Sequence, residues 1–268
     1  MPRRGTEGEA DGTGALHRAL QVLRVLAHRS PIGSRLSEIA AATSLPASTA
    51  HRLLKRLAAD GMVLRETGGR RLYKLGPFAL GLGPDGSAHP YGWLADLCRP
   101  AMEKLAARTG HAVQATVRIG RSGVSLALVD GAAPHPAFAK AGTVGFMGYG
   151  SASVVLLAAL PDTQIEEILW ENDWMLRQAA IRRDRLDALV AAARRQGFAY
   201  SEREFVADLC ALSVCIASAQ GAPYAALSLL VRAERIAPAE RDRLLAELRR
   251  TADGIARAAE RRRPIAAP

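Results

Sequence analysis

Cationic and hydroxyl side chains gather on one side of a predicted helix over residues 46–60, and recognition of phosphates or bases is the chemistry that they could do. The opposite side of this helix is apolar and consists of Ala50, Leu53, Leu54 and Leu57. The polar side and its flanks carry Ser48, Thr49, His51, Arg52, Lys55 and Arg56. Arginine can bind two acceptors of guanine, cations bind backbone phosphates, and hydroxyls at a helix start can hold a phosphate. A basic outer face is also common on any solvated helix, so this segment alone supports both interpretations equally.

A second cationic element follows this helix. Residues 62–65 and 71–75 have strand-like composition and flank Gly68-Gly69, a turn signal for a β-hairpin. The cations around this turn are Arg65, Arg70, Arg71 and Lys74. A cationic hairpin in this position suits contact with the DNA backbone beside a recognition helix. Two independent basic elements in this order favour a DNA-binding module over a merely solvated surface.

The charge distribution points the same way. The chain has 268 residues and a net charge of +10. Residues 15–80 contribute +8 of this charge, whereas residues 81–268 contribute +3 and residues 1–14 contribute −1. A generally arginine-rich composition would spread the excess evenly. A basic excess confined to one small domain is typical of a nucleic-acid binder.

The sequence lacks the motifs of enzymes, dinucleotide-binding sites and metal sites. No serine lies in a nucleophile elbow, and Gly81-Leu82-Gly83 lacks the third glycine of a dinucleotide fingerprint. His111 and His135 have no partners at metal-ligand spacing. The three cysteines are odd in number and loosely spaced, which indicates buried free thiols. We therefore expect no enzyme, no metal and no cofactor.

The sequence also predicts no membrane attachment. No apolar run follows the Arg3-Arg4 pair, so we expect no signal peptide. The longest apolar run, residues 154–160, is far shorter than the roughly 20 residues of a membrane span. These features predict a cytoplasmic protein.

The elements that must position the cations can be read along the chain. Residues 1–14 read as a disordered tail, and an amphipathic helix follows from Ala15. Ser34 is the expected N-cap of a short second helix ending near Thr43. Gly61 should end the third helix, and the hairpin follows it. We predict a DNA-binding domain over residues 15–76, and the Gly- and Pro-rich residues 77–92 form a linker.

Residues 93–262 form a second domain of mixed type. Helices are predicted over 93–109, 151–160, 162–170 and 184–196 and from Pro238 onward, and strands over 111–119, 124–130, 210–217 and 224–231. Strands at both ends with helices between them indicate an α+β domain around a sheet. A glycine-dense loop at residues 142–150 precedes Ser151 at a helix start. This arrangement either holds an anion at the helix N-terminus or simply makes a tight turn.

Several stretches resemble a known family. The runs "LPASTAHRLLKRL" at residues 45–57 and "YKLG" at 73–76 resemble the N-terminal domain of IclR-type regulators. The stretches at 141–161 and 196–231 resemble the later part of the same family. The resemblance implies a winged helix-turn-helix, a linker helix and a GAF-like effector-binding domain with a central antiparallel sheet. It further implies a homodimer or dimer of dimers on a palindromic operator, and a small organic or aromatic acid, typically a carboxylate, as effector.

The resemblance also implies the residues of an effector pocket. They are Met147, Tyr149, Ser151, Ser201, Glu204, Ala211 and Ser228. Some positions depart from the family pattern: Phe146 and Cys215 replace common prolines, and Ser153 replaces a common glycine. Two alternatives therefore stay open. One is a sensory or protein-interaction module whose winged helix lacks specific DNA binding, and the other is a regulator with a collapsed effector pocket.

Overall fold

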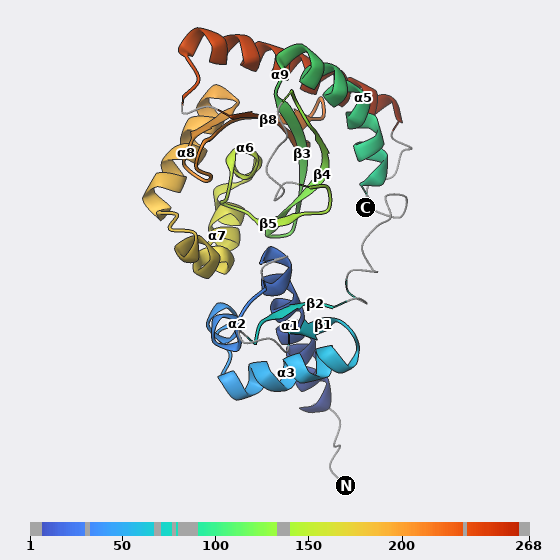
Figure 1. Ribbon diagram of the computed structural model, residues 1–268, viewed down its shortest axis with the longest axis vertical. Helices are drawn as coiled ribbons and strands as arrows, with labels where there is room; N and C mark the ends of the chain where they lie inside the picture. The colour runs from blue at the N-terminus through green and yellow to red at the C-terminus, as the bar shows by residue number, and fades with distance from the viewer. Residues whose placement is uncertain are drawn as a thin grey trace. The chain divides into compact units, whose positions relative to one another are not determined.

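A computed structural model describes residues 7–29, 33–66, 71–76, 79, 91–132, 140–232 and 235–262, with side chains from residue 14 onward. The chain divides into two compact units, Met1–Asp85 and Gly86–Pro268, and each is described by itself (Figure 1).

The N-terminal unit packs three helices against a hairpin. Its elements are α1 (Glu7–His28), α2 (Leu36–Thr43), α3 (Ala47–Ala59), β1 (Val63–Arg65) and β2 (Tyr73–Leu75). The two strands pair in antiparallel register, with Leu64 opposite Lys74. Leu26, Ile39 and Leu54, one from each helix, are fully buried together and form the centre of the core. The predicted order of helix, short helix, helix and hairpin is therefore present.

The start of α1 differs from the sequence pattern. Residues 7–14, which read as part of a disordered tail, are the first turns of α1. The sequence there contains glycines, which weaken a helix, but it also has Glu7, Glu9 and Asp11. Acidic residue types suit the positive N-terminal end of a helix.

The start of α2 corrects a second expectation. Ser34 is not the N-cap, because Arg35 takes that position and Glu38 accepts the Arg35 backbone N–H at 2.7 Å. Ser34 is instead fully buried in a β-bridge to Tyr73, with backbone N···O distances of 2.9 and 2.8 Å. The bridge satisfies backbone groups that a buried segment must pair.

The C-terminal unit is built on a curled, six-stranded antiparallel sheet (Figure 1). The strands are β3 (Ala112–Ile119), β4 (Ser122–Val129), β5 (Val144–Phe146), β6 (Ala199–Glu202), β7 (Leu209–Ala217) and β8 (Pro223–Arg232). Their order across the sheet is β5-β4-β3-β8-β7-β6. The sequence pattern missed β5 and β6, which are only three and four residues long and pair at the two edges.

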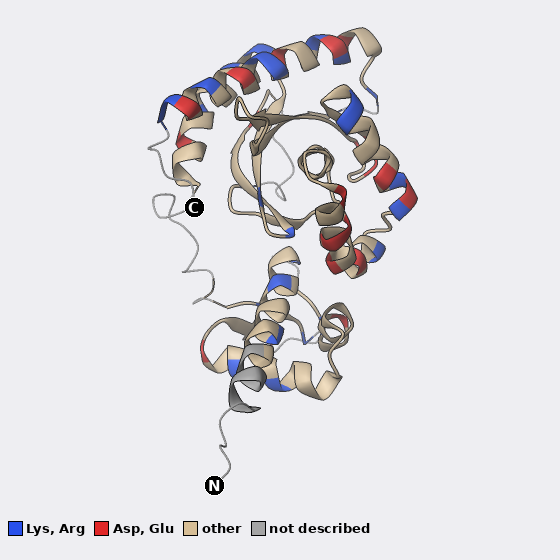
Figure 2. Ribbon diagram, turned by 180° about the vertical axis from the view of Figure 1, so that it is seen from behind, with Lys and Arg blue, Asp and Glu red and all other residues tan. Residues whose placement is uncertain are grey.

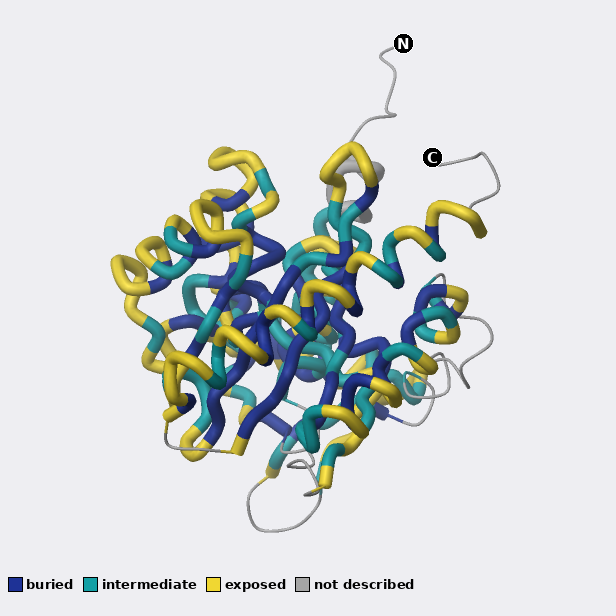
Figure 3. The backbone as a smooth tube through the Cα atoms, turned by 90° about the horizontal axis from the view of Figure 1, so that it is seen from above, coloured by how far each residue is buried: buried dark blue, intermediate teal, exposed yellow. Residues whose placement is uncertain are grey.

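Helices cover both faces of this sheet. They are α5 (Gly92–Thr109), α6 (Ser151–Ala158), α7 (Asp162–Gln178), α8 (Arg183–Gln196) and α9 (Pro238–Arg262). α5 and α9 pack on the outer face, and α6 lies inside the curl (Figure 1). Long stretches of the strands are buried, whereas the outer helices alternate between buried and exposed positions (Figure 3). The predicted α+β class with a central antiparallel sheet is confirmed.

Candidate functional site

The predicted cationic face of α3 is exposed and uncompensated. Pro46 is the N-cap of α3, and Gly61 follows its end with φ +69°, a conformation that suits glycine. Ala50 and Leu54 face the core. The exposed residues are Ser48, His51, Arg52, Lys55 and Arg56, and Thr49 is half-buried. Within the described part of the chain, no carboxylate pairs with the three long cations, so their charges remain available to an anion.

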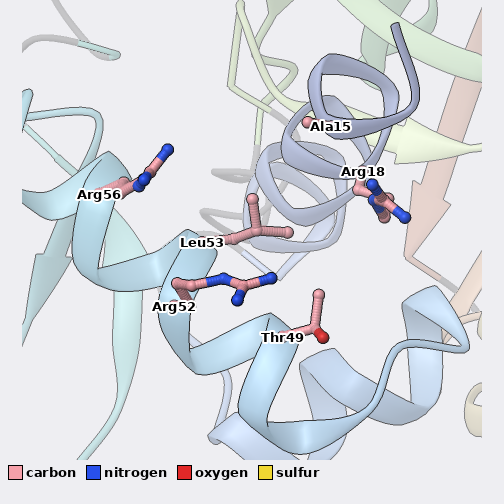
Figure 4. Close-up of a pocket in the computed structure, with 6 residues that line it drawn as sticks. All are labelled: Ala15, Arg18, Thr49, Arg52, Leu53 and Arg56. Carbon is pink, nitrogen blue, oxygen red and sulfur yellow. The ribbon is translucent and has the colours of Figure 1, made fainter. Parts of the chain in front are cut away.

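A groove runs between α1 and α3 in this unit. Its volume is about 310 Å³, and Ala15, Arg18, Thr49, Arg52, Leu53 and Arg56 line it. Figure 4 shows that Arg18 approaches from α1, whereas Arg52 and Arg56 rise from α3. Three guanidinium groups thus border one space.

Among the described cations of the hairpin, two are exposed and one is already paired with a carboxylate. Arg65 is exposed and lies 6.0 Å from the centre of the Tyr73 ring. Arg71 is exposed with φ +45°. Lys74 donates to Glu66 at 2.6 Å, so its charge is already compensated. Arg70 lies outside the described residues.

Serine hydroxyls form a buried row across the concave side of the sheet in the C-terminal unit. Ser151, at the start of α6, lies 2.7 Å from the Ser213 hydroxyl on β7, and Ser213 lies 2.7 Å from Ser228 on β8. All three residues are at most 3% exposed. Further along, Gln114 on β3, which pairs with Ser228, donates to Ser125 at 3.1 Å. Buried polar groups of this kind are satisfied within the row.

A small cavity adjoins this row. It holds about 20 Å³ and lies between Ser151 and Val154 of α6, Leu189 of α8, Ser201 of β6 and Phe205. This volume suits about one water molecule, whereas organic ligands occupy pockets of roughly 300–1,000 Å³. None of the described residues that line it carries a formal charge. An acid bound here would therefore rely on hydroxyls and helix N–H groups instead of a cation.

Phe205, which lines the cavity, contacts a second aromatic segment of the chain. The Tyr149 hydroxyl donates to the Phe205 carbonyl at 2.6 Å, and the two rings meet edge to face with centroids 5.5 Å apart. Phe146 packs against the other side of Tyr149 at 5.4 Å. Partial burial raises the pKa of Tyr149 above its ordinary value, so its phenol remains a donor at neutral pH. We call this contact, made by Phe146, Tyr149 and Phe205, the aromatic cover.

The loop that carries Phe205 connects β6 to β7 and is conformationally restrained. Arg203 and Asp208, near its two ends, have φ of +57° and +62°, which costs energy in residues other than glycine. Glu204, the second residue of the loop, forms an ion pair with Arg185 of α8. The loop is thus clamped to α8 and to the aromatic cover.

The preceding segment is held by a different set of contacts. The Ser153 hydroxyl accepts the Gly148 N–H, so the serine that departs from the family pattern fixes this turn. Gly148 has φ +103°, and a Cβ there would lie 2.7 Å from the Leu176 side chain. Met147 is fully buried, and its carbonyl accepts from Asn172 of α7 at 3.0 Å.

The predicted pocket residues are only partly brought together. Ser151 and Ser201 line the cavity, and Ser228 joins through Ser213. Tyr149 and Glu204 belong to the covering segments, whereas Met147 and Ala211 do not line the cavity: they pack in two separate apolar clusters. Sequence reasoning missed Ser213 and Phe205. Strand alternation places Ser213 on the same face as Ala211, and that polar residue in an apolar strand was the available signal.

Other chemistry is not supported by the described residues. Among them, no group of three or more His, Cys, Asp and Glu side chains could hold a metal ion. Among the helices that the structure describes, none is long and apolar enough to cross a membrane. Burial lowers the pKa of His111, whose charged neighbours are Glu240 and Arg243. The cysteines are free, and Cys98 and Cys210 are buried.

Comparison with known proteins places this geometry in a family. Residues 15–67 match the IclR helix-turn-helix domain, and residues 93–257 match the bacterial transcriptional regulator IclR C-terminal domain. The chain belongs to the IclR family. Members of this family are transcriptional regulators and not enzymes, so this IclR protein is a DNA-binding regulator with a C-terminal effector domain.

Individual relatives agree over the full length. The chain is 28% identical to the HTH-type transcriptional repressor AllR of Salmonella typhimurium, covering 98% of each protein. An IclR-family regulator from Brucella abortus has the same fold, with a TM-score of 0.70, 23% identity, and coverage of 96% of this chain and 99% of that one. The same holds for an IclR homolog from Microbacterium hydrocarbonoxydans complexed with 4-hydroxybenzoate, with a TM-score of 0.58, 22% identity, and coverage of 92% and 99%.

Proposed function

We propose that this IclR-family chain binds a specific palindromic operator and that a small organic or aromatic acid modulates this binding. Residues 15–76 act as the winged helix-turn-helix, residues 77–92 as the linker and residues 93–262 as the effector domain. The observation that carries the DNA-binding part is the uncompensated cationic face of α3, in a unit rich in basic and poor in acidic residues (Figure 2). A cytoplasmic homodimer or dimer of dimers fits a palindrome, because two-fold symmetry in the protein matches two half-sites.

The residues of α3 take different roles in this proposal. Arg52 reads a base edge, and guanine fits its two donors. Lys55 and Arg56 bind phosphates, and Ser48, Thr49 and His51 lie near the helix start, where base edges and phosphates are within reach. In the hairpin, Arg65, Arg70 and Arg71 approach the backbone. Lys74 contributes less than these, because Glu66 already neutralises it.

Selection from a pool of genomic DNA fragments tests the DNA-binding proposal. We expect one palindromic site to be enriched, and log affinity to fall linearly with log salt. A dimer that neutralises roughly six phosphates has a slope of about −5. Arg52→Ala should relax base preference, whereas Lys55→Ala should weaken binding to all sequences and flatten the slope by about 1. Recovery of no fragment over random DNA would favour the sensory or interaction module instead.

The effector part of the proposal rests on the serine row and the start of α6. Hydroxyls and the N–H groups of a helix N-terminus can hold a carboxylate without a cation. The relative complexed with 4-hydroxybenzoate indicates an aromatic acid as the first compound to test. Because the cavity holds about 20 Å³, such an acid must displace the aromatic cover as it enters. Ser151, Ser201 and Ser228 would then line or support the enlarged pocket, and Tyr149 and Glu204 would move with its cover.

Titration calorimetry with a panel of aromatic and short aliphatic carboxylates tests this part. We expect at least one acid to bind and to change operator affinity, and Ser151→Ala to weaken that acid without changing operator binding in its absence. The small cavity also gives a specific reason to consider the collapsed pocket. If no acid binds at millimolar concentration while the operator is still recognised, the chain is a regulator in one fixed state.

A further inference from the structure

The outer face of α7 carries two tryptophans, one helical turn apart. Trp170 is 82% exposed, and no other large apolar side chain among the described residues exceeds 62%. Trp174 is half-buried and lies four residues further along, on the same face of the helix. Tryptophan is usually well buried in a folded chain, and it is enriched at the centres of protein interfaces. Because Trp170 packs so little within its own unit, this face is suited to contact with another protein surface.

The charges on this face decide which partner it fits. Most of its carboxylates are already neutralised: Glu166 pairs with Arg183, Glu171 with Arg121 and Asp173 with Arg177. Glu167 forms no ion pair with any described residue. The Arg177 side chain is 67% exposed, so its guanidinium can bind a second carboxylate beside that of Asp173. A strongly basic partner would therefore find only one carboxylate without an ion pair, whereas the face offers both a cation and an anion.

A second copy of α7 supplies the matching groups. If two α7 helices pack antiparallel about a two-fold axis beside Asn172, each residue meets the one equally far on the other side of position 172. Trp170 then meets Trp174 of the second copy, and Glu167 meets Arg177 of the second copy. Glu171 and Asp173 lie on opposite flanks of the helix, about 160° apart, so they do not face each other. The face is thus complementary to itself in both shape class and charge.

We propose that the outer face of α7 is a contact between two copies of this chain, with the two tryptophans at its centre and a Glu167–Arg177 pair at each end. The inference rests on the proposed homo-oligomer and names a surface that builds part of it. α7 has 17 residues, which corresponds to a length of about 25 Å. One helix pair of this length is small for a protein interface, so we expect this step of association to be weak.

The inner face of α7 joins this contact to the candidate effector site. Asn172 donates to the Met147 carbonyl at 3.0 Å, between the two aromatic residues of the cover that precede α6. Gly148 lies against Leu169 and Leu176, since a Cβ there would be 3.3 and 2.7 Å from their methyl groups. An acid that displaces the aromatic cover would therefore act on α7 as well. Linkage then requires effector binding and self-association to change each other's affinity by the same factor.

Charge reversal in the full-length chain tests the contact. Sedimentation velocity over a wide range of protein concentration measures each association step. Glu167→Arg and Arg177→Glu should each weaken one step about ten-fold, because like charges then face each other at both ends. The double variant should restore that step to within about three-fold of the wild type, which is the coupling that a direct pair requires. Glu103→Arg is the matched control, because Glu103 is an exposed carboxylate of α5 without an ion pair to a described residue.

The tryptophans give an independent readout. Trp170→Ala should weaken the same step at least about thirty-fold, the effect of removing a residue from the centre of an interface. In a Trp93→Phe background, acrylamide should quench the remaining fluorescence less as the protein concentration rises. Since Trp170 is exposed in the single chain, Trp170→Ala should melt at the same temperature as the wild type in dilute solution. A large loss of melting temperature would mean that Trp170 serves packing within the chain, against the proposal.

The remaining outcomes separate this inference from the proposed function. If the chain self-associates but every α7 variant behaves like Glu103→Arg, α7 is not the contact and the homo-oligomer stands. If both single reversals weaken association and the double variant does not restore it, the antiparallel pairing is refuted. If the chain stays monomeric at every concentration, the contact and the homo-oligomer both fail, while operator selection is measured separately. Protection of Trp170 by added polylysine, where the chain is monomeric, would favour a basic partner over a second copy.

Discussion

Removing one hydroxyl from the aromatic cover should strengthen effector binding. Tyr149→Phe keeps the ring and its contacts with Phe146 and Phe205 but deletes the hydrogen bond to the Phe205 carbonyl. A hydrogen bond of this kind contributes about 0.5–1.5 kcal/mol. Tyr149 is 37% exposed, so water partly replaces the bond and the lower half of that range applies. We expect the closed state to lose about 0.5–1 kcal/mol.

This loss translates directly into apparent affinity. If an acid binds only when the cover is open, its apparent dissociation constant is the intrinsic constant divided by the open fraction. A loss of about 0.5–1 kcal/mol then tightens binding roughly two- to five-fold. Since burial raises the pKa of Tyr149, the phenol stays protonated and the gain should be constant between pH 6 and 9.

Titration calorimetry with 4-hydroxybenzoate, or with the best acid from the panel, measures this gain. Tyr73→Phe is the matched control, because it removes the same atom from the N-terminal unit and should leave effector affinity unchanged. Weaker binding by Tyr149→Phe would mean that the hydroxyl contacts the ligand. Unchanged binding would mean that the hydrogen bond does not hold the cavity closed. Either result refutes the reasoning.

Two further perturbations test the C-terminal unit. Gly148→Ala should destabilise the protein by about 2–4 kcal/mol in urea unfolding, because φ is +103° and the new Cβ meets Leu176. Gly110→Ala, at a left-handed position with φ +73°, ψ +3° and open space around it, should lose only about 1–2 kcal/mol, and equal losses would contradict the packing argument. Burial raises the pKa of Cys98 to about 12 and of Cys215 to about 11, so the folded protein should react slowly with Ellman's reagent at pH 8 and quickly once unfolded. Rapid labelling without unfolding would count against this burial. The pKa values of both thiols in the folded state lie above the ordinary thiol pKa, so the stability that the neutral thiols contribute is complete below about pH 8.5 and falls as the pH rises further.

The N-terminal unit was the more predictable part of the fold. Its helices carry a clear 3.6-residue pattern, and turn residues such as Pro46 and Gly61 mark the ends of α3. The exposed positions of Arg52 and Lys55 follow from the same pattern. What the pattern could not predict was pairing across the chain. Ser34 has the residue type of an N-cap, but its bridge to β2 decides its role.

The candidate pocket was less predictable for the same reason. The row from Ser151 to Ser213 joins residues 62 positions apart, and the cover joins Tyr149 to a loop 56 positions away. Only strand register and loop closure bring such groups together. The family resemblance points to Ala211 and not to Ser213, although both lie on one face of β7.

The serine row has a consequence for which ligands it can distinguish. Each hydroxyl has one proton, and in both contacts of the row either oxygen can be the donor. A ligand that accepts from Ser151 requires Ser213 to donate to Ser151 and Ser228 to donate to Ser213. A ligand that donates to Ser151 allows all of these bonds to reverse. A carboxylate on Ser151 therefore fixes the direction of both contacts as far as the middle of the sheet, whereas an amide N–H of equal shape at the same position leaves the opposite direction available.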